Sequence, residues 1–215
     1  MHDQVRVELD DRDFTEVALR PFGVGGSTMR GWSDTDADPM RALLDTLVED
    51  PAPEPVVLLT LGGNDLLDAA ASADRVRDDL RRVVSALADA RDDVIVVLAS
   101  YDVVNPAVAP AECRGVFDET LGVTDIADIT GAFRRQWAVL EATAADLAPV
   151  VTVDAFGTLQ GRPGDPDVAS PSPVEYLQDC LHLNDDGHDL YLDEVFDQAL
   201  TPVLCRTEDA AVCGR

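Results

Sequence analysis

Two stretches of the chain consist almost wholly of apolar residues, VVLLTL from Val56 to Leu61 and VIVVLA from Val94 to Ala99. Continuous apolar runs rich in Val are typical of parallel strands that are covered on both faces of a sheet. Shorter apolar runs predict two further strands, from Phe14 to Leu19 and from Val150 to Val153. We therefore expect a mainly parallel sheet buried between layers of helix.

Elsewhere the apolar residues recur at the spacing of amphipathic helices. This pattern predicts helices over Asp74–Ala90, Ala132–Leu147 and Asp185–Leu200. Two segments rich in Pro, Gly and Asp, Tyr101–Thr124 and Phe156–Pro173, predict loops, and each follows a predicted strand. Ligands of open α/β sheets bind at the carboxyl ends of the strands, so we expect these loops to form the walls of a site.

Charge narrows the classes of partner. The chain has 215 residues, with 42 acidic residues against 16 basic ones and a formal net charge of −26. A field this negative repels phosphate backbones and anionic lipids, so nucleic acid is not expected as a partner. No run reaches about 18 apolar residues, so no membrane span is expected. Residues 1–204 are predicted to form one domain, followed by a tail over residues 205–215.

Four cysteines leave the redox state open. Cys113 could pair with Cys180, and Cys205 could pair with Cys213 to close the tail, but buried free thiols are an equal alternative. No CxxC spacing is present, so a zinc site is not expected. Paired cysteines would favour an exported protein, and the sequence leaves the compartment and the oligomeric state open.

Other metal signals are weak. The run DTDAD, residues 34–38, resembles the start of a calcium loop, but Pro39 stands where the turn needs Gly and Asp45 where a bidentate Glu is expected. His182 and His188 are six residues apart and would not share a helical face as metal ligands. We expect no metal and no organic cofactor.

Two of the three histidines lie in one polar run, DCLHLNDDGH, residues 179–188. Asp179 precedes His182 by three residues, so one turn can place the carboxylate against the imidazole and stabilise its protonated form. Asn184 or Asp185 is expected to cap the last helix. In isolation, a surface Asp and His near a helix start would give the same pattern.

The run LGGNDLLD, residues 61–68, directly follows a predicted strand. Its glycines, including Gly62, allow a sharp turn, and Asn64 presents a neutral amide that can stabilise a developing oxyanion. An Asn-Asp turn that caps the next helix is the alternative. We expect Asp65 to do the capping and Asn64 to face the site.

A third run, FGVGGST from Phe22 to Thr28, also follows a predicted strand. It lacks the GxGxxG spacing of a dinucleotide site. The amide of Gly26 could serve as a second oxyanion donor, although a plain Gly-rich turn would look the same.

Taken together, these three runs resemble the SGNH (GDSL-type) hydrolases, a family of serine esterases and lipases with a three-layer α/β/α, flavodoxin-like fold. The matches follow the family's block order: Gly26 in the second block, Gly62, Asn64 and Asp65 in the GxND block, and Asp179 with His182 in the DxxH block. The resemblance extends from about Phe14 to Leu200. It implies an esterase that cleaves small-molecule carboxylic esters, with His182 as base and Asp179 as its partner.

The family's first block is Gly-Asp-Ser, whose serine is the nucleophile, and this sequence contains no such tripeptide. The run from Val5 to Leu9 is too close to Phe14 for a parallel crossover, so we expect it to end a helix or form a hairpin. Three explanations stay open. We favour a nucleophile block encoded upstream of Met1. The chain could instead be a non-catalytic ester- or glycan-binding module or a fragment, or Ser27 or Ser100 could substitute.

Overall fold

Three parallel strands form the centre of the computed structural model, which describes residues 2–12, 14, 17–50, 54–68, 71–108 and 110–207. The strands are β1 (Val56–Leu59), β2 (Ile95–Ala99) and β3 (Val150–Val153), in the order β1-β2-β3. Val57 pairs with Val96, and Val97 pairs with Val151. Three of the four predicted strands are therefore confirmed, although β1 ends two residues earlier than the apolar run.

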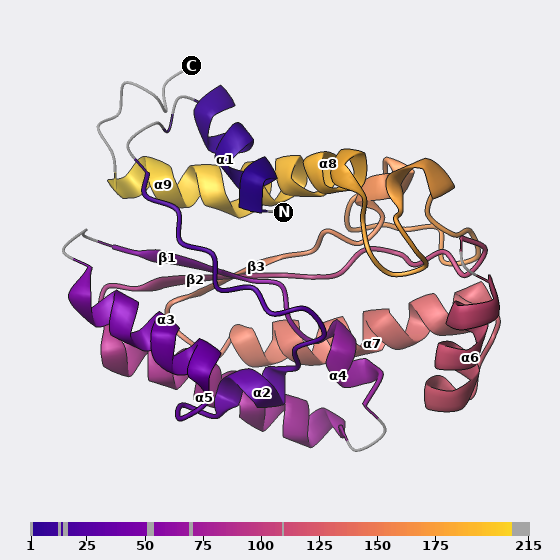
Figure 1. Ribbon diagram of the computed structural model, residues 1–215, viewed down its shortest axis with the longest axis horizontal. Helices are drawn as coiled ribbons and strands as arrows, with labels where there is room; N and C mark the ends of the chain where they lie inside the picture. The colour runs from indigo at the N-terminus through magenta and orange to yellow at the C-terminus, as the bar shows by residue number, and fades with distance from the viewer. Residues whose placement is uncertain are drawn as a thin grey trace.

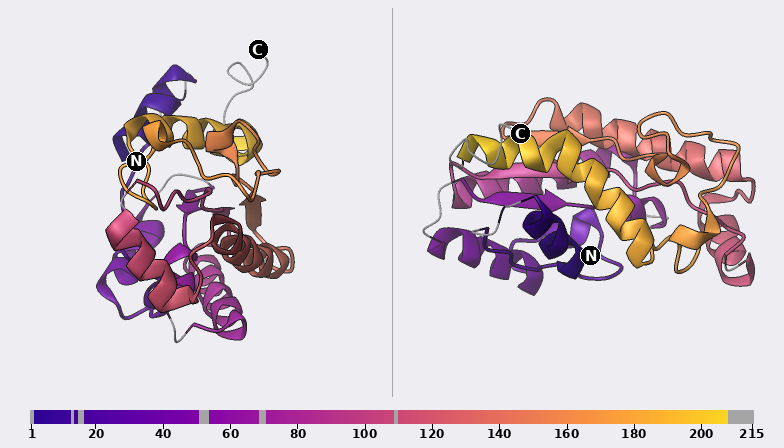
Figure 2. Two further views of the ribbon diagram at one scale, coloured as in Figure 1. Left: turned by 90° about the vertical axis from the view of Figure 1, so that its right-hand side faces the viewer. Right: turned by 90° about the horizontal axis from the view of Figure 1, so that it is seen from above.

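Helices cover both faces of this sheet, as the views in Figures 1 and 2 show. One layer contains α1 (His2–Asp11), α8 (Asp185–Val195) and α9 (Thr201–Thr207), the last two joined by a π-helical turn over Phe196–Leu200. The other contains α2 (Met29–Ser33), α3 (Asp38–Glu49), α4 (Gly63–Leu66), α5 (Ala73–Ala90), α6 (Pro110–Leu121) and α7 (Ile126–Ala144). The predicted three-layer α/β/α fold is confirmed.

Local capping explains where the helices begin. Ser72 accepts a hydrogen bond from the amide of Arg75 at the start of α5, and Asn184 accepts one from the amide of Gly187 at the start of α8. Asp125 caps α7, which begins six residues before its predicted start. All three predicted helices form, and α1 confirms the helical alternative for the segment from Val5 to Leu9.

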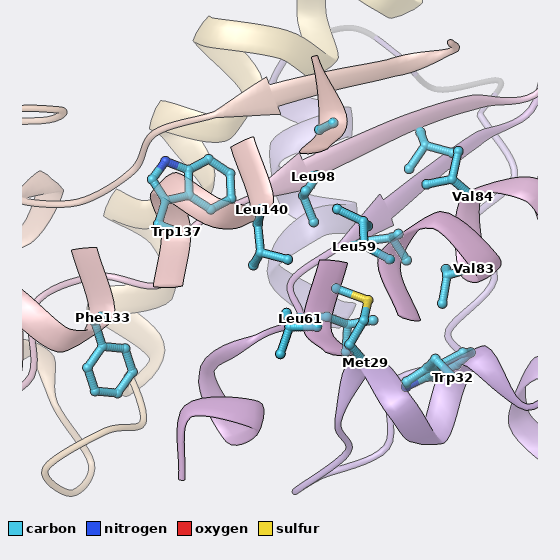
Figure 3. Close-up of a cluster of buried hydrophobic side chains, with 14 of the residues drawn as sticks. Met29, Trp32, Leu59, Leu61, Val83, Val84, Leu98, Phe133, Trp137 and Leu140 are labelled. Atoms are coloured by element: carbon cyan, nitrogen blue, oxygen red, sulfur yellow. The ribbon is translucent and has the colours of Figure 1, made fainter. Parts of the chain in front are cut away.

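The central strand β2 is buried on both faces, as its apolar sequence predicts, whereas β1 and β3 are partly buried. Val96 and Leu98 of β2 pack into the larger core under α3, α5 and α7, whereas Val97 and Ala99 pack into the core beneath α8. Figure 3 shows part of the larger core, in which Leu59 and Leu98 of the sheet lie among Met29, Trp32, Val83, Val84, Phe133, Trp137 and Leu140.

The prediction of a strand over Phe14–Leu19 is wrong for its described residues; residues 15 and 16 lie outside the described part of the chain. Phe14 and residues 17–19 are irregular and do not pair with the edge strand β1. A strand needs a neighbour for its backbone groups, and this segment instead uses other bonds: the carbonyl of Val17 accepts from the guanidinium of Arg6 at 2.8 Å. Phe14 is still buried, in the core under α8. Side-chain packing therefore explains its apolar pattern.

The predicted loop over Tyr101–Thr124 is wrong in its second half, which forms α6. Cys113 on this helix forms a disulfide bond with Cys180, so that pairing is confirmed and the free-thiol alternative is wrong for these two residues. The predicted bond between Cys205 and Cys213 reaches residue 213, which lies outside the described part of the chain. None of the helices described here is long and apolar enough to span a bilayer.

Candidate active site

The segments that carry the predicted site residues gather where the strands end. Parallel strands place their carboxyl ends at one edge of the sheet, so the segments after β1, β2 and β3 start side by side. The segment that contains His182 lies at this edge, because the backbone amide of Asn105, after β2, donates a hydrogen bond to the carbonyl of Cys180 at 3.0 Å.

His182 and Asp179 form the predicted pair. Nδ1 of His182 lies 2.7 Å from Oδ2 of Asp179, while Oδ1 accepts from the amides of Leu181 and His182, both at 2.8 Å. Partial burial opposes ionisation of Asp179, but these hydrogen bonds outweigh it and lower its pKa. The side chain of His182 is 66% exposed. The carboxylate therefore fixes one ring nitrogen and leaves the other side of the imidazole accessible to a substrate.

A tight turn presents this pair. The amide of Gln178 donates to the carbonyl of His182 at 2.8 Å, and Leu177 bridges to Leu183. Just beyond it, a Cβ on Gly187 would lie 2.1 Å from the carbonyl oxygen of Tyr176, so only glycine fits at this position. The glycine allows α8 to start against the turn.

The second group combines Gly26, Asn64 and their neighbours. Nδ2 of Asn64 donates to the carbonyl of Ser27 at 3.0 Å. Gly26 has φ +73° in a turn that is closed by the bond from the amide of Ser27 to the carbonyl of Val24. Its own N–H has no partner among the described residues. The structure thus brings together the two predicted oxyanion donors, which lie 38 positions apart in the chain.

Glycines shape the turn before Asn64. Gly62 has φ +106°, a backbone conformation that favours glycine, and a Cβ there would lie 2.6 Å from Leu140. A Cβ on Gly63 would lie 2.7 Å from the ring of Tyr101, so the segments after β1 and β2 are in close contact.

The expectation that Asp65 caps the next helix is wrong, because Ser72 caps α5. The carboxylate of Asp65 instead accepts a hydrogen bond from the amide of Met29 at 2.7 Å, and Asp65 is only 3% exposed. Burial raises the pKa of Asp65 against the opposing hydrogen bonds from the amides of Met29 and Arg30. The residue satisfies the start of α2 and so fixes the Gly26 turn against α4.

The Asp179–His182 pair and the group formed by Gly26 and Asn64 share no hydrogen bond within the described residues, but the segment after β2 contacts both. Its Tyr101 packs on Gly63, and its Asn105 binds the segment before His182. Between them Asp102, 8% exposed, accepts from the amides of Val103, Gly157 and Leu159. Burial raises the pKa of Asp102 to about 6 against these three bonds. Sequence reasoning missed Asp102 and Asn105, although polar residues directly after an apolar strand were a usable signal.

The two candidate substitute serines have other partners. Oγ of Ser27 accepts from the indole of Trp32 at 3.0 Å. Ser100 is 1% exposed, and its Oγ accepts from the amide of Ala155 at 2.8 Å. No described serine is hydrogen-bonded to His182.

Comparison with known proteins then gives the family. A family model for the GDSL-like Lipase/Acylhydrolase family matches residues 2–190, most of the chain and all of the site residues above. A search of the curated proteins found no match. The family has the SGNH α/β/α fold, with which the three-stranded parallel sheet agrees, and its members are hydrolases. The chain belongs to the GDSL-like lipase/acylhydrolase family.

Proposed function

We propose that this protein hydrolyses carboxylic esters of small molecules through an acyl-serine intermediate. The observation that carries the proposal is the 2.7 Å contact between His182 Nδ1 and Asp179 Oδ2 in a chain of the acylhydrolase family. An imidazole held in this way is suited to take a proton at Nε2 and to return it.

In the proposed reaction, Nε2 of His182 takes the proton of the serine hydroxyl as the serine oxygen attacks the ester carbonyl. Asp179 stabilises the imidazolium that forms. The N–H of Gly26 and the second Nδ2 proton of Asn64 donate to the tetrahedral oxyanion, while the first Nδ2 proton stays on Ser27. His182 then protonates the departing alcohol. Water attacks the acyl-serine by the same steps and releases the acid.

The proposal also gives a position for the nucleophilic serine. We place it on a segment that leads into α1, because the first turn of α1 lies beside the first turn of α8: Nε2 of Gln4 donates to Oδ1 of Asp185 at 2.9 Å, three residues beyond His182. A serine just before α1 would be near the imidazole. Ser27, just before α2, and Ser100, directly after β2, already have structural partners, which argues against a substitute.

The test compares two forms of the protein: the chain of 215 residues, and the same chain extended by the in-frame coding sequence upstream of Met1. Both are treated with a fluorophosphonate probe and assayed with a nitrophenyl ester. We expect labelling and turnover only in the extended form, and loss of both in His182→Ala. Asp189→Asn, an exposed change on α8, is the matched control.

Two results would overturn parts of this account. Turnover by the 215-residue chain that His182→Ala abolishes would place the nucleophile within it. Absence of labelling and turnover in both forms would overturn the hydrolase proposal and favour a non-catalytic binding module, for which the serines' existing hydrogen bonds are the supporting observation.

A further inference from the structure

Asn105 makes three hydrogen bonds from a buried position after β2. Its side-chain Nδ2 donates to the carbonyl of Ser172 at 2.5 Å, its backbone amide donates to the carbonyl of Cys180 at 3.0 Å, and its Oδ1 accepts from the amide of Ala107 at 2.9 Å. Asn105 is 3% exposed, so none of these bonds can be replaced easily by solvent.

The two donor bonds hold both ends of one segment. Ser172 begins the stretch that leads through a 3₁₀ turn at Val174–Tyr176 to the catalytic pair, and Cys180 directly follows Asp179. The bond to Ser172 is deeply enclosed, because that residue is 0% exposed. Asn105 therefore fixes both ends of this segment: its side chain holds the start at Ser172, and its backbone amide holds the residue next to Asp179.

The segment after β2 that carries Asn105 is itself fixed by bonds to other parts of the fold. Asp102, three residues earlier, accepts hydrogen bonds from Gly157 and Leu159 in the segment after β3. The disulfide between Cys113 and Cys180 adds a covalent link from the segment after Asn105 to the same stretch. Because these bonds fix the segment that carries Asn105, the orientation of the Asn105 side-chain amide determines the position of the segment that it binds.

We propose that Asn105 is a positioning residue for the Asp179–His182 pair, acting through its amide bond to the carbonyl of Ser172. The inference rests on the proposed function for its catalytic meaning. An amide is needed here because the partner is a carbonyl, which only accepts. Aspartate has the same shape but would set a carboxylate oxygen against the Ser172 carbonyl in a buried place.

The test uses Asn105→Asp and Asn105→Ala, with Ser172→Ala as the matched control. The control changes the residue at the other end of the bond but keeps the backbone carbonyl that accepts it. Thermal melts establish that each variant is folded. The first readout is the downfield proton resonance of His182 Nδ1, which reports the bond to Asp179 and needs no turnover. The second is the split between kcat and KM in the ester-hydrolysing form.

We expect both Asn105 variants to weaken or broaden the Nδ1 resonance and to lower kcat about 10- to 100-fold, since small displacements of a catalytic group are costly. KM should change by less than about twofold, and Ser172→Ala should leave both readouts unchanged. An unchanged resonance in both Asn105 variants, or equal losses in Ser172→Ala, would overturn the proposal. If no form hydrolyses an ester, the proposed function fails, and the resonance still decides whether Asn105 positions the pair.

Discussion

Nδ2 of Asn64 lies 3.0 Å from the backbone carbonyl of Ser27 and donates a hydrogen bond to it. This bond joins the turn that contains Gly26 to the first residues after β1. Its consequence is that the two proposed oxyanion donors are held together before any substrate binds, which is the condition for electrostatic stabilisation without reorganisation.

We predict that Asn64→Ala lowers kcat for a nitrophenyl ester about 10²- to 10³-fold, the usual effect of removing one oxyanion donor. KM should change little, because the donor acts mainly on charge that develops in the transition state. Steady-state kinetics of the ester-hydrolysing form check this. A loss confined to KM would show that Asn64 only binds the ground state.

We predict that Asp179→Asn lowers kcat about 10³- to 10⁴-fold. The amide that replaces Oδ1 or Oδ2 would face either the donating amides of Leu181 and His182 or the Nδ1 proton of His182, so the tautomer and orientation of the ring are lost. Asp186→Asn, an exposed change seven residues later, should leave kcat unchanged. Equal rates in the two variants would contradict the assigned role of Asp179.

The lowered pKa of Asp179 also predicts how the pair responds to acid. Because the folded-state pKa lies below the ordinary value of 3.8, the stabilisation from this pair is present above that value and is lost as pH falls through the folded-state pKa. A carboxyl titration by NMR should show a midpoint for Asp179 below 3.8. A midpoint above it would contradict the hydrogen-bond geometry.

Asp102 is predicted to behave in the opposite way. Burial raises its pKa from 3.8 to about 6, so its contribution to stability is fully present below 3.8 and is lost as pH rises through about 6. The shift corresponds to about 3 kcal/mol between the two protonation states. The same NMR titration should give a midpoint near 6, and urea melts should show the accompanying decline between pH 4 and 6.5. A midpoint at the ordinary value would show that the three backbone bonds fully compensate for burial.

Reduction of the bond between Cys113 and Cys180 should destabilise the fold. The two residues are 67 positions apart, and closing a loop of this length stabilises the folded state by about 4 kcal/mol in the chain-entropy model. Urea melts of the wild type, with and without a reductant, against the double variant Cys113→Ala/Cys180→Ala measure the effect. Equal midpoints in all three samples would contradict it.

The parts of the fold that the sequence could predict depend on short-range pattern. The strands β1 and β2 form from continuous apolar runs, because their residues pack into the cores on the two sides of the sheet. The shorter run of β3 also forms a strand, although only Val153 in it is buried. The Asp179–His182 pair was predictable for a related reason, since three residues of spacing allow contact within one turn.

The parts that sequence reasoning missed depend on distant partners. The segment at Phe14–Leu19 has the composition of a strand, but whether it pairs is decided by a neighbour that local pattern does not reveal. Asp65 accepts a hydrogen bond from the amide of Met29, 36 positions away, and does not cap the nearby start of α5. Asn105 likewise bonds across 67 positions to Ser172.

The central proposal is that His182, held by Asp179, activates a serine on a segment that leads into α1. Mass spectrometry of the fluorophosphonate-treated, N-terminally extended protein tests it most directly. We expect one modified peptide, which contains a serine that precedes α1, and no modification of that peptide in His182→Ala. A modified serine within the 215 residues, or labelling that persists without His182, would contradict the account.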